Sequence, residues 1–222
     1  EACDVLESAE DFDLAVHDLI KEYATQHQRI VFNGNGYAPE WEKEARRRGL
    51  PVLPSMVDAI PALTTDKAVE LFGEFGVFTK TELESRAEIQ YEIYAKAINI
   101  EAKTMVDMAT KQIIPAVIKY TTVLAESINQ VKAVGPIDVS VQMDLLKKAS
   151  KLLKEVNSTM NKLSKLVDQI ETHPEGRDRA VFCREKLVPA MEKLREPVDE
   201  LEMLVDKDMW PMPSYGDLVF EP

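Results

Sequence analysis

The sequence predicts a mainly α fold: a long antiparallel three-helix bundle, a small helical N-terminal subdomain and an extended C-terminal tail. Three observations predict it. Residues 79–132 contain no glycine and a single proline. Apolar residues recur there at steps of three and four, the spacing of one helix face. Two further stretches with this spacing follow after short connections, so consecutive helices should be antiparallel neighbours.

The composition limits the classes of function. A chain of 222 residues with 45% hydrophobic content can bury a core. No apolar run approaches the ~20 residues that span a bilayer, and residues 1–20 lack the order of a signal peptide, so a cytoplasmic location is expected. The net charge of −12 argues against a nucleic-acid or anionic-membrane partner. The one dense basic run, residues 46–48, is better explained as a solvated helix end than as a binding patch.

Residues 1–78 are expected to form the small helical subdomain, with at most one short β hairpin or strand. Asp11 or Asp13 can cap a helix that ends near residue 27. Residues 29–32 (RIVF) are typical of a short β segment, and the following NGNG sequence suits a turn with positive φ. That turn could instead cradle a phosphate, but it lacks the Lys-Ser ending and the full glycine fingerprint of such loops.

Three more short segments complete this subdomain. A helix over residues 40–48 should stop at Gly49. Ser55 with Asp58 can cap one further turn, and Thr65 or Asp66 can cap a segment that reaches residue 72. Glycines at positions 73 and 76 then break the chain before the bundle begins.

The bundle is expected over residues 79–209. Thr79 and Glu82 have the spacing of a capping box, which should start the first helix. Pro115 should bend this helix near Lys111, because its ring meets the carbonyl four residues back. The predicted apolar stripe consists of Ile98, Ala102, Met105, Ala109, Ile113, Ala116, Val117, Tyr120, Leu124, Ile128 and Val131.

The second and third helices follow the same logic. Asp138 or Ser140 can cap the second helix, which should end by residues 173–174 (HP). Pro189 and Pro197 should bend or divide the third. The predicted stripe of the second helix is Val141, Leu145, Ala149, Leu152, Val156, Met160, Leu163, Val167 and Ile170, and that of the third is Val181, Leu187, Val188, Met191, Leu194, Val198, Leu201 and Val205.

The C-terminal tail, residues 210–222, is expected to be extended. Pro211 and Pro213 remove backbone donors and push the residues before them out of the α region. The tail is nevertheless rich in apolar side chains, so it should dock on its own bundle or on a neighbouring subunit.

Several segments closely resemble the C-terminal part of type III glutamine synthetase. They occur in the same order and span nearly the whole chain. The segments are residues 29–37 (RIVFNGNGY), Trp41, 48–51 (RGLP), 57–59 (VDA), 76–79 (GVFT), 82–86 (ELESR), 98–102 (INIEA), 114–117 (IPAV) and 210–220 (WPMPSYGDLVF).

The resemblance implies a ligase that joins ammonia to glutamate at the expense of ATP, with magnesium or manganese. In that family the ATP, glutamate and metal ligands lie in motifs upstream of such a segment, and none of those motifs is present here. We therefore expect no catalytic, cofactor-binding or metal-binding residue in this chain. The absence of an initial methionine, and a first stretch that looks like the middle of a helix, suggest that it continues from an upstream catalytic domain. Its partners would be that domain and sister subunits of a large homo-oligomer.

Other candidate chemistry is weak. His17, His27 and His173 are too far apart in sequence to form a helical metal site, and surface positions are expected for them. Carboxylate pairs such as Glu82 with Glu84, Glu88 with Glu92 and Glu200 with Glu202 are better explained as solvated helix faces than as acid–base pairs. Cys3 and Cys183 are expected to be free thiols, and Cys183 lacks a histidine base.

A second interpretation sets the resemblance aside. The chain would then be a stand-alone acidic helical-bundle module whose surface binds a protein partner. The two hypotheses differ in one property. A segment of a larger enzyme should expose an apolar surface, most of it on residues 1–78, whereas a natural stand-alone module should be polar there.

Overall fold

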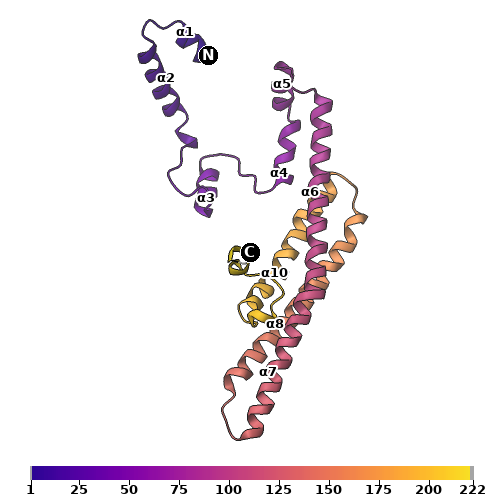
Figure 1. The fold of residues 1–222 in the computed structure, drawn as a ribbon. Helices are drawn as coiled ribbons and strands as arrows, with labels where there is room; N and C mark the ends of the chain where they lie inside the picture. Colours follow the sequence, from indigo (N-terminus) through magenta and orange to yellow (C-terminus); the bar gives the residue numbers. More distant parts are fainter. Residues whose placement is uncertain (1, 221–222) are drawn as a thin grey trace. The chain divides into compact units, whose positions relative to one another are not determined.

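The structure is a computed structural model that describes residues 2–220. Its elements are helical, and no strand occurs among these residues, so the mainly α prediction is confirmed. The chain divides into two compact units, one ending at Pro54 and one beginning at Ser55 (Figure 1). Within the described range, no helix is both long and apolar enough to span a membrane.

The first unit contains three short α-helices and one turn of 3₁₀-helix: α1 (Ala2–Glu7), α2 (Phe12–Gln26), η1 (Gln28–Ile30) and α3 (Pro39–Arg47). The Asp11 carboxylate caps α2 by accepting a 3.0 Å hydrogen bond from the Leu14 amide. Helix α3 ends in a Schellman motif, in which the Leu50 amide bonds the Ala45 carbonyl at 2.9 Å and Gly49 has φ 69°.

The β segment predicted over residues 29–32 is wrong, because Gln28–Ile30 form the 3₁₀ turn η1. A short β-type run needs a partner strand to supply its ladder hydrogen bonds, and the described chain provides none. The positive φ expected in the NGNG turn is also wrong. The glycines with positive φ in the described chain are Gly49, Gly76 and Gly176.

The second unit begins with three short elements that pack against the first long helix: α4 (Met56–Ala59), η2 (Ile60–Thr64) and α5 (Asp66–Glu74). Ser55 caps α4 and Thr65 caps α5, as the sequence indicates. Residues 55–78 thus pack with the bundle, although the sequence analysis grouped them with residues 1–54.

Three long helical runs of 55, 33 and 26 residues form the bundle (Figure 1). They consist of α6 (Lys80–Met108), η3 (Ala109–Ile113) and α7 (Ile114–Val134); α8 (Ser140–Gln169) and η4 (Ile170–Thr172); and α9 (Arg177–Phe182), η5 (Cys183–Leu187) and α10 (Val188–Glu202). The capping box of Thr79 and Glu82 is present at the start of α6. Asp138 accepts the Ser140 amide at 2.9 Å before α8.

The core of the bundle is aliphatic. Its most completely buried side chains are Leu83, Val117, Val156, Leu163, Ile170, Leu187, Leu194 and Leu201, together with the thiol of Cys183. The predicted stripes account for most of these residues. Val141 is an exception: it was assigned to the stripe of α8 but is 69% exposed in the first turn of that helix.

Two segments of the bundle, η3 and η5, are π-helices. Each is followed at once by an X-Pro pair, Ile114-Pro115 and Val188-Pro189. In place of the bend expected near Lys111, the helix contains a π-helix. Its wider turn accommodates the absence of a backbone N–H at Pro115. Pro197 was also expected to bend or divide its helix, but it lies buried inside α10 and the helix continues past it.

A pattern of four-residue steps explains why η3 forms where it does. The buried face passes through Met105, Ala109, Ile113 and Val117, each four positions after the last. On a regular α-helix of 3.6 residues per turn, every such step rotates the face by about 40°. The extra residue in a π turn cancels this drift, so the stripe stays on the bundle.

The prediction that the tail is not helical is wrong. It contains the helix α11 (Tyr215–Phe220), and the 3₁₀ turn η6 (Lys207–Met209) directly precedes the tail. Ser214 and Asp217 form a reciprocal cap: the Ser214 amide donates to the carboxylate at 2.7 Å, and the Asp217 amide donates to the hydroxyl at 3.3 Å. Pro211 and Pro213 restrict only the residues before them, which leaves Ser214 free to start a helix.

Candidate functional site

The histidines do not form a cluster. His17 lies exposed beside Asp18, and His173 stacks on Phe182 with ring centroids 3.9 Å apart. Throughout residues 2–220, no group of three His, Cys, Asp or Glu side chains is placed to hold a metal ion. The absence of a metal site from the whole chain stays a prediction.

The candidate carboxylate pairs lie on exposed helix surfaces. Glu84 and Glu92 pair with lysines four residues away on α6, at 3.8 and 3.0 Å. Glu200 pairs with Lys148 of α8 at 3.8 Å. Hydrogen bonds from the backbone and side chain of Thr79 lower the pKa of Glu82, its partner in the capping box. These contacts are those of solvated helix faces rather than of an acid–base pair.

The two cysteines are free and differ in exposure: Cys3 is exposed, whereas Cys183 is buried in the bundle core. Burial raises the pKa of the Cys183 thiol to about 11. A thiol with such a pKa holds almost no thiolate near neutral pH, so this residue cannot serve as a nucleophile there.

The NGNG turn is shaped by packing rather than by an anion site. A Cβ atom on Gly34 would lie 2.7 Å from two ring carbons of Phe32, whereas a Cβ on Gly36 would meet nothing within 4 Å. The Phe32 ring in turn packs on Trp41, with centroids 4.6 Å apart. The lack of a side chain at Gly34 thus allows the backbone to approach the Phe32 ring closely.

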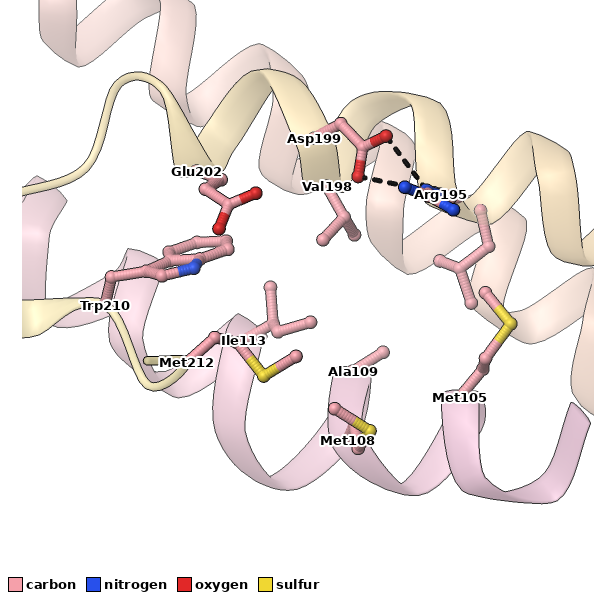
Figure 2. Close-up of a pocket in the computed structure, with 11 residues that line it drawn as sticks. Met105, Met108, Ala109, Ile113, Arg195, Val198, Asp199, Glu202, Trp210 and Met212 are labelled. Carbon is pink, nitrogen blue, oxygen red and sulfur yellow. Dashed lines mark hydrogen bonds and ion pairs between the residues drawn. The ribbon is translucent and has the colours of Figure 1, made fainter. Parts of the chain in front are cut away.

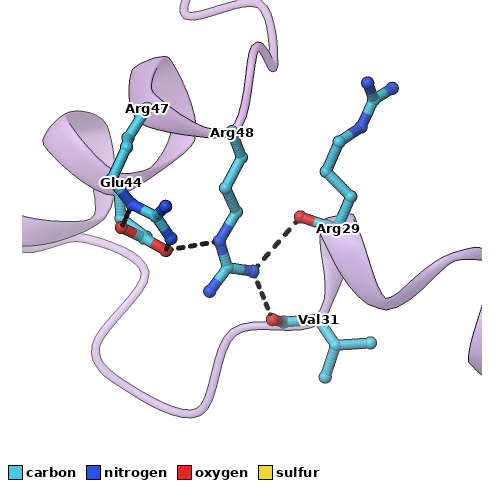
Figure 3. A network of polar contacts seen from close by, with 5 residues as sticks. All are labelled: Arg29, Val31, Glu44, Arg47 and Arg48. Atoms are coloured by element: carbon cyan, nitrogen blue, oxygen red, sulfur yellow. Dashed lines mark hydrogen bonds and ion pairs between the residues drawn. The ribbon is translucent and has the colours of Figure 1, made fainter.

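Glu44 organises the basic run at the end of α3 (Figure 3). Arg47 donates to both of its carboxylate oxygens at 2.6 Å, and Arg48 donates to one of them at 2.6 Å. Hydrogen bonds from Arg47 and Arg48 lower the pKa of Glu44 to about 2. Two of the three arginines are thus occupied by this carboxylate, and Arg46 lies 4.0 Å from Glu42.

Arg48 also joins α3 to the segment before it. Its Nη1 donates to the carbonyl of Val31 at 2.6 Å and to that of Arg29 at 3.1 Å (Figure 3). The Arg48 guanidinium therefore bonds two backbone carbonyls that would be hydrogen-bond acceptors in a β ladder. The run is a structural clamp within the first unit rather than an open basic patch.

The first unit exposes many large apolar side chains and buries few. Ala45 is the one buried residue among residues 2–54. The exposed set comprises Val5, Phe12, Leu14, Ile20, Tyr23, Ile30, Val31, Tyr37 and Leu53. An apolar surface of this kind is typical of a binding interface.

The second unit contains a mostly apolar cavity of about 290 Å³ between the α6–η3 junction, α10 and the tail (Figure 2). No local sequence pattern indicates this cavity, because its three segments come together only in the fold. Its lining consists of Met105, Met108, Ala109, Ile113, Leu194, Arg195, Val198, Asp199, Glu202, Trp210 and Met212.

Comparison with known proteins identifies the family. A model of the glutamine synthetase C-terminal domain matches residues 15–132, which is more than half of the chain. The chain belongs to the glutamine synthetase C-terminal domain family. The family resemblance found in the sequence motifs is thereby confirmed.

Two glutamine synthetases align with nearly the entire chain. A glutamine synthetase of Butyrivibrio fibrisolvens is 33% identical over 214 residues, which cover 96% of this chain and 31% of that protein. A type-3 glutamine synthetase of Dictyostelium discoideum is 33% identical over 211 residues, covering 93% of this chain and 29% of that protein. This glutamine synthetase C-terminal domain thus spans about a third of the length of its relatives.

Proposed function

We propose that this chain is the C-terminal helical segment of a type III glutamine synthetase and carries no active site itself. The parent enzyme would join ammonia to glutamate with hydrolysis of ATP. Two similarities support this proposal: the order of the sequence motifs, and the alignment of the chain with less than a third of each relative. ATP and magnesium or manganese would bind to the remainder of the enzyme, in the cytoplasm.

The task of the segment would be structural. The observation that carries this proposal is the composition of the first unit, which exposes nine large apolar side chains and buries Ala45 alone among residues 2–54. Because such a unit gains little from burial by itself, it should be stabilised by a further surface. The catalytic domain and sister subunits of a large homo-oligomer would supply that surface.

The direct test is to isolate the native polypeptide that carries this sequence, using an antibody against the bundle. Because the chain is 31% of one relative, the native polypeptide should be about three times heavier than 25.1 kDa. It should form glutamine from glutamate, ammonia and MgATP, whereas the 222-residue chain should not.

Two outcomes would overturn the proposal. A native band near 25.1 kDa would mean that the cell uses the chain alone, as the stand-alone interaction module requires. A heavier polypeptide without ATP-dependent glutamine formation would exclude the synthetase activity.

A further inference from the structure

The cavity between η3, α10 and the tail has the features of a small-ligand site. Its volume of about 290 Å³ is just below the usual range of ligand pockets, roughly 300–1,000 Å³, and suits a small ligand. The floor is the buried, small side chain of Ala109, the first residue of the π-helix. Met105, Met108 and Met212 stand around it in Figure 2. Methionine side chains adapt readily to the shape of a ligand, and π-helices recur at functional sites.

The charged groups of the cavity all come from one face of α10. Arg195 and Asp199 neutralise each other through an ion pair of 3.0 Å. Glu202, one turn further on, is exposed and makes no hydrogen bond or ion pair within the described part of the chain. It lines the cavity together with Trp210 (Figure 2). The cavity therefore carries a net charge of about −1 next to an aromatic ring.

The Trp210 ring is held by packing alone. Its Nε1 is buried and finds no acceptor among residues 2–220. The ring can therefore shift to admit a ligand without breaking a hydrogen bond within that range. Neighbouring residues 211–214 are exposed, so the tail wall of the cavity has little packing to resist such a shift.

We propose that this cavity binds a small organic ammonium ion with a short apolar body. The apolar body would displace water from the methionine and aliphatic walls, and the ammonium group would lie between the Glu202 carboxylate and the Trp210 indole. An anion of the same shape is disfavoured by the carboxylate, and a neutral molecule gains no charge attraction from the exposed Glu202. This proposal does not depend on the proposed synthetase function.

The test compares three ligands of one shape: 2-phenylethylammonium, neutral 2-phenylethanol and anionic phenylacetate. The chain has two tryptophans, so Trp41→Phe leaves Trp210 emission as the reporter of binding. The ammonium ligand should change this emission saturably, with the alcohol weaker by about tenfold and phenylacetate silent at up to about 10 mM.

Matched variants separate a site from general attraction to an acidic protein. Glu202→Gln should weaken binding of 2-phenylethylammonium by about tenfold. Glu192→Gln, which removes an exposed carboxylate of α10 away from the cavity, should leave binding unchanged. Val198→Phe should abolish binding by filling the space, with circular dichroism to confirm folding.

Three results would overturn the proposal: no saturable binding of the ammonium ligand, equal affinity for the alcohol, or equal weakening by Glu192→Gln and Glu202→Gln. The ligand comparison uses the Trp41→Phe chain without further changes, so it decides the question even where a cavity variant fails to fold.

Discussion

Arg184 of the π-helix η5 forms an ion pair with Asp58 of α4, 126 positions earlier in the chain. Asp58 also accepts a 2.9 Å hydrogen bond from the Ser55 hydroxyl. The two charged side chains are only 30% and 28% exposed. This contact fixes the short helices at the start of the second unit to the third helix of the bundle.

Stability should depend on pH through this contact. The Ser55 hydroxyl, with a further contribution from Arg184, lowers the pKa of Asp58 below its ordinary value of 3.8. A carboxyl group whose pKa is lower in the folded state stabilises the fold at pH values above its unfolded-state pKa. This contribution is lost as the pH falls through its folded-state pKa. Asp58→Asn should therefore destabilise the protein at neutral pH, and its difference from the wild type should shrink as the pH falls below 3.8 and through the lower folded-state pKa. Urea unfolding across this range tests the prediction, which a pH-independent difference would contradict.

Truncation of core leucines should be costly. Leu152 and Leu194 are 4% and 1% exposed, so replacement of either by alanine should lower the free energy of unfolding by ~2–5 kcal/mol. Val141→Ala is the control, because this residue is on the same helix as Leu152 but is 69% exposed. Its effect should stay within about 0.5 kcal/mol in chemical denaturation. Similar costs for Val141 and Leu152 would mean that burial does not set the effect.

A charge on the apolar face of α2 should impair assembly of the parent enzyme. Ile20 is 63% exposed, so Ile20→Asp removes little buried surface from the first unit but places a carboxylate in the proposed interface. Thr25→Asp, which places the same charge at a polar position about 140° around the same helix from Ile20, is the control. Light scattering on the full-length enzyme should show fewer intact oligomers for the first variant only. Equal assembly of both would remove this face from the interface.

Gly34 and Gly36 should respond differently to substitution. A Cβ on Gly34 would lie within 2.7 Å of the Phe32 ring and must displace it from Trp41, whereas Gly36 has open space around it. Gly34→Ala should therefore shift the fluorescence of Trp41, measured with Trp210→Phe to leave one tryptophan. Gly36→Ala should not. An equal fluorescence shift in both variants would mean that the loss of glycine's backbone freedom causes it, rather than contact with the Phe32 ring.

Thiol titration should count one reactive cysteine in the folded chain. Cys3 is exposed, while Cys183 is buried with a pKa raised to about 11. An aromatic disulfide reagent at about pH 8 should modify Cys3 quickly and Cys183 only after unfolding by urea. Rapid modification of two thiols without denaturant would show that the bundle core opens.

Four helix caps were predicted correctly from local sequence. The caps at Asp11, Ser55, Thr65 and Thr79 all form, because each depends on residues within three positions of one another. The bundle helices follow from periodicity that is repeated over many turns. The cap formed by Ser214 and Asp217 has equally local spacing, but the prolines before it directed the prediction away from a helix.

The long-range contacts could not be predicted from the sequence alone. The Arg48 clamp on the Val31 carbonyl replaces a strand with an irregular segment, and neither residue indicates the other. The cavity at Ala109 likewise brings together residues that are about a hundred positions apart. Met105 and Trp210 have ordinary apolar character, so no local pattern distinguishes a cavity wall from filled core.

The two π-helices bear on how the length of this domain can vary among relatives. A π turn holds one residue more than an α turn, so each can be viewed as a one-residue insertion that the helix has absorbed. A homologue without that residue would keep an unbroken α-helix there. Single-residue gaps in alignments of this family should accordingly cluster at residues 109–113 and 183–187, where the chain can shorten without losing a turn.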